Sequence, residues 1–163
     1  MYTTGLAKLC PDSSVHGVDV MYRALSLSSK MAELNECNNV KLHSKVDSQS
    51  ISELIQGETF IVCDCEGFEE VNLDPTKQPR LLECDLLVEV HDHLAPGVSE
   101  KLNKWYVNTH HVEWINPERR SIDEYQSLFP ELTREQLREV LDEERDNSVC
   151  WVSLRRLSRL PNQ

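Results

Sequence analysis

Short apolar runs alternate with amphipathic stretches along nearly the whole chain. The two clearest runs, at 60–63 and 86–88, are continuous, which is typical of parallel strands covered on both faces. Weaker strand patterns occur at 15–20, 40–46, 109–115 and 148–154. Helical spacing of apolar residues predicts helices at 2–9, 21–35 and 96–106, with shorter ones after Ser50, Ser121 and Thr133. This alternation predicts an α/β fold: a doubly wound, mostly parallel sheet whose last strand could be antiparallel.

Helix starts and core-facing stripes can also be read from residue spacing. Capping boxes are expected at three pairs: Ser50 with Glu53, Ser121 with Glu124, and Thr133 with Gln136. Gly57 is expected to end the first of these helices. Apolar residues share one face of the helix at 21–35 and form a buried stripe on the helix at 96–106: Ala24, Leu27, Met31 and Leu34 in the first, Val98, Leu102, Trp105 and Tyr106 in the second.

Acidic and imidazole side chains stand where the two central apolar runs end. Asp64 and Glu66 follow the first run at a spacing of two, so an extended chain places them on one face. Glu89 directly follows the second run and precedes Val90, so it lies within the predicted strand that ends at His91. A bare carboxylate in an apolar strand is costly, and open α/β sheets bind ligands at the carboxyl ends of their strands. We therefore interpret these four residues as a candidate catalytic site.

Structural roles compete with this interpretation. Asp64 and Glu66 could cap the turn that follows, and Glu89 could pair with Arg80 or Arg145. A functional role is favoured because one cap needs one carboxylate and this turn offers several. Glu69 and Glu70 are expected on the solvated surface.

Histidines raise the question of a metal. His91, Asp92 and His93 could bind a divalent ion together with Asp64, but hard cations prefer oxygen ligands. A hydrogen-bonded histidine at the strand end is favoured, so no metal site is expected. His110 and His111 stand at the start of a predicted strand. This is the wrong end of a strand for a site in a parallel sheet, so we expect both histidines to be structural.

Composition narrows the possible partners. The chain has 163 residues, which suits one domain, and a net charge of −11, which argues against non-specific nucleic-acid binding. No apolar run approaches the length of a membrane span, and the N-terminus lacks a secretory pattern. The six cysteines include no CxxC pair, so buried thiols in a reducing cytoplasm are favoured over disulfides or zinc. The arginines near the end are expected in a solvated tail: Arg155, Arg156 and Arg159.

One motif suggests a family. The segment DCEGFE at 64–69, followed by CDLLVEVHD at 84–92, resembles the DxEGxE signature and next strand of FkbM-like class I S-adenosylmethionine-dependent methyltransferases. The resemblance implies a seven-stranded Rossmann-like sheet with an antiparallel last strand and S-adenosylmethionine as cofactor. It assigns Asp19 to the ribose hydroxyls of the cofactor, Asp64 and Glu66 to the side of the transferred methyl group, and Glu89 with His91 to the acceptor side.

The chain departs from this family at its start. The family's first strand and glycine-rich loop should stand immediately before Tyr2, so residues 1–163 resemble an N-terminally truncated domain. The missing strand would lie between the strands at 15–20 and 59–65. These could pair directly or leave a gap, and we expect the gap, with poor expression or self-association through unpaired edges.

Three functions follow as hypotheses. The first is a methyltransferase acting on a hydroxyl of a small molecule or sugar, with His91 or a neighbouring carboxylate as general base. The resemblance implies that this activity could be absent from the truncated chain. The second is a non-catalytic interaction domain that keeps the methyltransferase fold. The third is a Rossmann-like domain that uses another nucleotide.

Overall fold

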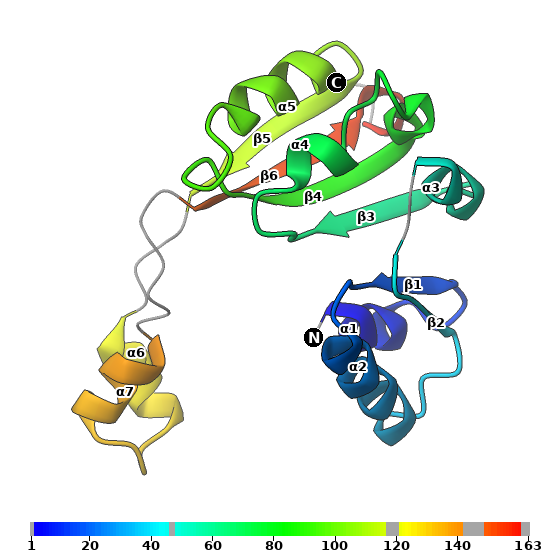
Figure 1. The fold of residues 1–163 in the computed structure, drawn as a ribbon. Coiled ribbons are helices and arrows are strands. Elements are labelled where there is room, and N and C mark those ends of the chain that lie inside the picture. Colours follow the sequence, from blue (N-terminus) through cyan, green and yellow to red (C-terminus); the bar gives the residue numbers. More distant parts are fainter. Residues whose placement is uncertain (1, 46–47, 117–120, 142–148, 161–163) are drawn as a thin grey trace. The chain divides into compact units, whose positions relative to one another are not determined.

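The computed structural model describes residues 2–45, 48–116, 121–141 and 149–160 (Figure 1). It divides into two compact units. Unit 1 holds the chain up to Thr59 together with Thr76–Arg80, and unit 2 holds Phe60–Pro75 and the chain from Leu81 onward. None of the described helices has the length and apolar character needed to cross a membrane.

Unit 1 is built on a pair of parallel strands. Its elements are α1 (Tyr2–Leu9), β1 (Val15–Val18), α2 (Tyr22–Leu34), β2 (Val40–His43) and α3 (Ser48–Leu54). β1 and β2 pair in parallel, with Val15 opposite Val40. Gly17 allows α1 to approach β1 closely, because a Cβ there would lie 2.9 Å from both Leu42 Cδ2 and Thr3 Oγ1. The strand–helix–strand order is the one predicted from the sequence.

Several predicted details of unit 1 are wrong. β1 ends at Val18 because the Asp19 side chain accepts the Met21 amide and turns the chain into α2. α3 begins at Ser48, so Ser50 lies inside the helix instead of capping it. The apolar face of α2 is open, with Leu27 62% and Leu34 79% exposed.

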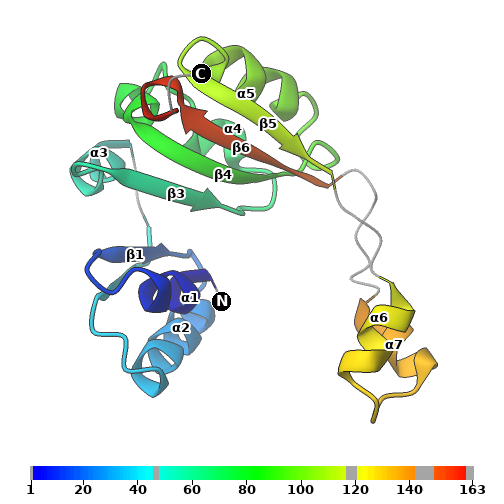
Figure 2. The ribbon, with the colours of Figure 1, turned by 180° about the vertical axis from the view of Figure 1, so that it is seen from behind.

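Unit 2 contains a four-stranded sheet in the order β3-β4-β6-β5. The strands are β3 (Thr59–Cys63), β4 (Cys84–Val90), β5 (His110–Ile115) and β6 (Cys150–Arg156). β6 is antiparallel to both β4 and β5, so β4 and β5 run in the same direction. Figure 2 shows the arrow of β3 pointing the same way as that of β5. The predicted fold class, including the antiparallel last strand, is confirmed.

Helices and turns complete unit 2. They are α4 (Glu69–Asn72), α5 (Val98–Tyr106), α6 (Ile122–Leu128), α7 (Arg134–Leu141) and a 3-10 helix at Leu157–Arg159. A further 3-10 helix, Pro79–Glu83, begins in unit 1 and continues into unit 2. The capping box of α7 is complete, because Thr133 and Gln136 exchange hydrogen bonds. At the start of α6 the N-cap half of the expected box is formed, with Ser121 Oγ accepting the Glu124 amide at 3.4 Å.

The core of unit 2 lies between the sheet and α5. Fully buried residues alternate along β4 and β6 and recur along α5: Leu86, Val88, Val90, Val152, Leu154, Val98, Leu102 and Tyr106. Each such side chain contributes about 1.5–3 kcal/mol by leaving water. His110 is buried at the start of β5, where its Nε2 bonds to the Cys84 carbonyl, as its predicted structural role requires.

The opposite face of the sheet is more open than predicted. Phe60 of β3 is 53% exposed, so this strand is not covered on both sides. The expected solvated arginine tail is also wrong, because β6 continues to Arg156 and the following turn returns Arg159 to the sheet. Arg156 and Arg159 both pair with the Asp85 carboxylate.

Strands β1 and β3 are not paired with each other. Among the described residues, β1 belongs to a two-stranded sheet and β3 is an end strand of the four-stranded sheet. The direct pairing considered for a chain without the central strand is therefore not formed.

Candidate active site at the carboxyl ends of strands β3 and β4

A tight turn follows β3 and presents Asp64 and Glu66. Glu66 has φ 51° and Gly67 has φ 91°, so two consecutive residues adopt the left-handed conformation. A residue other than glycine is strained in this conformation, and such strain concentrates at functional sites. A Cβ on Gly67 would lie 2.9 Å from Leu94 Cβ, so the turn is packed closely against the segment that follows β4.

His91 stands at the end of β4, facing this turn. Its ring is buried, and Nε2 lies 4.0 Å from Asp64 Oδ1 and 3.4 Å from Glu66 Oε2. Glu89, two residues earlier on the same strand, is 2% exposed. Donor atoms of Asp64, Glu89 and His91 all lie within 4.8 Å of one another. The four residues expected from the sequence are therefore brought together at the carboxyl ends of the two strands.

Glu69 is a site residue that the sequence analysis placed wrongly on the surface. Its side chain is fully buried, and Oε1 accepts hydrogen bonds from His91 Nδ1 at 2.6 Å and from the Gly67 amide at 3.2 Å. Its second oxygen, Oε2, is buried with no hydrogen-bond partner among the described residues. Because Glu69 accepts from Nδ1, the other ring nitrogen of His91 faces Asp64 and Glu66. Its position as the last acidic residue of DCEGFE was the signal that could have identified it.

Asp92 and His93 do not join the donor set. Asp92 Oδ1 accepts the amides of Gly97 and Ser99 at 3.0 and 3.3 Å, so this carboxylate caps the start of α5. The His93 ring lies tilted against that of His91, with centroids 5.8 Å apart. The donor set considered from the sequence was His91, Asp92 and His93 with Asp64. The structure instead groups Asp64, Glu89 and His91. Glu70 is half-exposed and pairs with Lys101.

Two thiols flank Asp64. The sulfur atoms of Cys63 and Cys65 are 3.5 Å apart. The hydrogen bond between them raises the pKa of Cys63, to which burial adds, and lowers the pKa of Cys65. Cys65 is therefore the sulfur that more readily becomes a thiolate in this pair.

Asp19 belongs to unit 1. It lies just after β1, is half-buried, and holds the Met21 amide at 2.8 Å. The N-cap of α2 is Met21, so Asp19 does not itself cap that helix. Its expected role toward a ribose stays a prediction.

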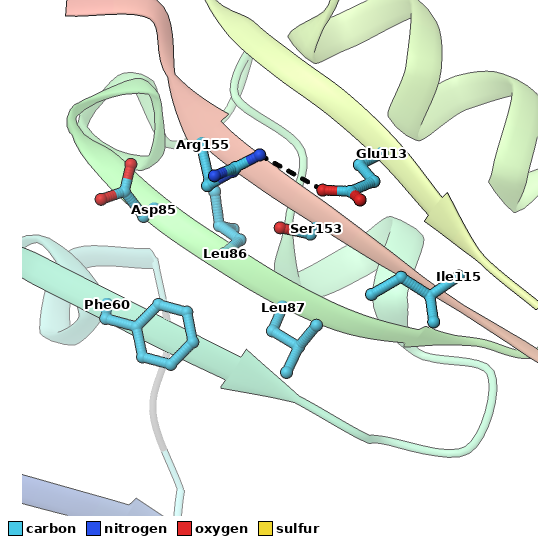
Figure 3. Close-up of a pocket in the computed structure, with 8 residues that line it drawn as sticks. All are labelled: Phe60, Asp85, Leu86, Leu87, Glu113, Ile115, Ser153 and Arg155. Carbon is cyan, nitrogen blue, oxygen red and sulfur yellow. Dashed lines mark hydrogen bonds and ion pairs between the residues drawn. The ribbon is translucent and has the colours of Figure 1, made fainter. Parts of the chain in front are cut away.

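A shallow hollow of about 400 Å³ lies on the open face of the four-stranded sheet (Figure 3). Phe60, Leu87 and Ile115 supply its apolar lining, and Arg155 is paired with Glu113 at 3.3 Å. By the alternation of a strand, Asp85, Leu87 and Glu89 share this side of β4. None of the candidate site residues lines the hollow itself.

Comparisons with known proteins bear on the fold. No protein-family model matches the chain, and no curated protein sequence is similar to it. Among solved structures, a "putative rRNA-methylase" from Clostridium thermocellum superposes with a TM-score of 0.51 at 11% identity, covering 87% of this chain and 72% of that one. The MccD protein superposes with a TM-score of 0.49 at 13% identity, over 94% and 86% of the two chains. The likeness to the first of these structures agrees with the α/β fold of this chain.

Proposed function

We propose that this chain acts as an S-adenosylmethionine-dependent methyltransferase that methylates a hydroxyl group of a small molecule or sugar. The observation that carries the proposal is the convergence of Asp64, Glu66, Glu89 and His91 at the strand ends, with His91 held by buried Glu69. This is where open α/β sheets bind their ligands. The likeness of the chain's fold to that of the putative rRNA-methylase supports it.

Unit 1 offers one group suited to the cofactor. Asp19 is half-buried at a strand end, and the Met21 amide fixes its Oδ1. A carboxylate so placed can accept hydrogen bonds from the two hydroxyls of a ribose. When bound, S-adenosylmethionine would supply a methyl group activated by a sulfonium centre.

The residues of the cluster would prepare the acceptor. His91 donates from Nδ1 to Glu69, which orients Nε2 toward an incoming hydroxyl and leaves it able to take the hydroxyl proton. The resulting imidazolium would be stabilised by the carboxylates of Glu69 and Glu66, the second lying 3.4 Å from Nε2. Glu66 is 77% exposed, so it can pass the proton on to solvent.

A sensitive binding experiment tests the cofactor side. We expect weak but saturable binding of S-adenosylhomocysteine, measured by saturation-transfer NMR, and loss of that binding in Asp19→Asn. Asp12→Asn removes the same charge from an exposed loop of unit 1 and should leave it unchanged. No saturable binding at millimolar ligand, or an equal loss in both variants, would overturn the proposal.

Transfer itself is tested with a radiolabelled methyl donor and a panel of hydroxyl compounds. Any transfer should disappear in His91→Gln and persist in His111→Gln, an exposed histidine on β5. Transfer that survives in His91→Gln would remove this residue from the reaction.

A second candidate is a non-catalytic interaction domain. The open sheet face favours it, because Phe60 is 53% and Ile115 44% exposed beside the hollow. Absence of cofactor binding, together with a partner whose binding is lost in Phe60→Ser, would favour this function over the enzyme.

A further inference from the structure

Three donor groups of a metal site converge beside the turn after β3. Donor atoms of Asp64, Glu89 and His91 lie within 4.8 Å of one another, and Asp64 Oδ1 is 4.0 Å from His91 Nε2. Two ligands of one ion, each about 2.0–2.2 Å from it, lie about 3–4 Å apart. The distance is too long for a hydrogen bond and suits two ligands of one cation.

The surroundings of His91 match those of a metal ligand. A ligating histidine usually donates its other ring nitrogen to a carboxylate, which fixes the tautomer and orients the ring. Glu69 does this at 2.6 Å, and it is fully buried and anchored in turn by the Gly67 amide. Its Oε2 is buried without a hydrogen-bond partner among the described residues, which leaves negative charge beside the cluster. The carboxylates of Asp64 and Glu89 also meet there, so a cation would relieve the repulsion between these negative charges.

We propose that Asp64, Glu89 and His91 bind a divalent first-row transition-metal ion, with Glu69 as the positioning residue for His91. One imidazole and two carboxylates suit Mn²⁺, Fe²⁺ or Zn²⁺, whereas Mg²⁺ prefers oxygen ligands alone. Asp64 is 25% exposed, so the ion has an open side toward solvent. An acceptor hydroxyl could bind there, in which case exposed Glu66 would take its proton in place of His91. The inference stands whether or not the chain binds S-adenosylmethionine.

Manganese is the sharpest probe. It binds thiolates poorly, so Cys63 and Cys65 should not compete for it. We expect the chelator-treated protein to bind a single Mn²⁺, read as loss of the free-ion EPR signal, and excess Mg²⁺ to displace it poorly. Asp64→Asn, Glu89→Gln and Glu69→Gln should each weaken binding about 10–100-fold.

Glu70→Gln is the matched control for the high negative charge of the chain. It removes one carboxylate beside Glu69 but from a half-exposed side chain that pairs with Lys101. Binding should be unchanged in this variant. Equal weakening in Glu70→Gln would show a diffuse charge effect and overturn the site.

The proposal can still be tested with Asp64→Asn if the variants at the buried residues Glu89 and Glu69 do not fold. The Asp64 side chain is partly exposed, so this substitution should leave the fold intact. Unchanged Mn²⁺ affinity in Asp64→Asn, or no binding by the native chain, would overturn the proposal. In that case a direct contact between His91 Nε2 and the Glu66 carboxylate would explain the geometry instead.

Discussion

The backbone at Gly67 determines how the site turn is packed. Gly67 and Gly97 both have positive φ, 91° and 85°, but only Gly67 has a neighbour where a Cβ would be placed. That neighbour is Leu94 Cβ, which is close to the backbone and cannot rotate away.

Gly67→Ala should therefore destabilise unit 2 more than Gly97→Ala. The left-handed backbone costs an alanine about 1–2 kcal/mol, and the overlap with Leu94 adds about 1–3 kcal/mol. Urea unfolding followed by tryptophan fluorescence measures this, because the three tryptophans, Trp105, Trp114 and Trp151, all belong to unit 2. Equal free energies of unfolding for the two variants would show that the turn adapts to a side chain.

At the scale of elements, a histidine pair joins the two strands of unit 1. His16 Nδ1 lies 2.9 Å from His43 Nε2, and the rings stack with centroids 5.2 Å apart. Burial lowers the pKa of His16 below 6.5, and the positive charges of His43 and Lys41 lower it further.

Unit 1 should consequently lose stability in mild acid. The unfolded chain binds the proton of His16 more readily than the folded one, so the contribution is complete above pH 6.5 and is lost as the pH falls below that value toward the lowered pKa. Chemical unfolding followed by the NMR signal of Gly17 should show this slope. His16→Gln should flatten it and His111→Gln should not; an unchanged slope in His16→Gln would refute the assignment.

The two edges of β1 should also differ in hydrogen exchange. Val15 and Asp19 donate their amides toward β2, so the alternation of a strand directs the amides of His16 and Val18 to the other edge. We expect the Gly17 amide to exchange slowly and the Val18 amide quickly in the monomer. Strong protection of Val18 would mean that another strand pairs with this edge.

Periodicity was sufficient to predict most elements, because apolar spacing reports directly on strands and helices. It failed where burial depends on contacts between distant segments. Glu69 looks like a surface residue in EGFEE, yet the turn at Gly67 carries it under His91. Arg159 looked like part of a polar tail, but Asp85, far away in sequence, draws it to the sheet. The convergence of the site residues followed from the rule for strand ends, whereas the orienting role of Glu69 required the fold.

On the scale of the whole molecule, charge and exposed apolar surface oppose each other. Phe60 of the end strand β3 and Ile115 of β5 are largely exposed, while the net charge of −11 keeps copies apart. We propose that the chain self-associates through these surfaces once the charge is screened.

Sedimentation velocity at low and high salt tests this. The average mass should rise with protein concentration, and more steeply at high salt, because screening shortens the range of the repulsion. Phe60→Ser removes an exposed apolar side chain and should reduce the effect. A single monomeric species under all conditions would contradict it.

The division into units has a consequence for how the chain can be cut. Unit 1 includes Thr76–Arg80, which follow β3 and the site turn in sequence. Arg80 donates to the Ser52 carbonyl at 2.7 Å, and Gln78 accepts from the Ser52 hydroxyl at 2.8 Å. During synthesis the hydrogen bonds of Ser52 with Gln78 and Arg80 can therefore form only after Phe60–Pro75 of unit 2 has been synthesised. A chain ending at Thr59 would lack these hydrogen bonds. Neither unit can therefore be removed or exchanged as one continuous segment of the sequence.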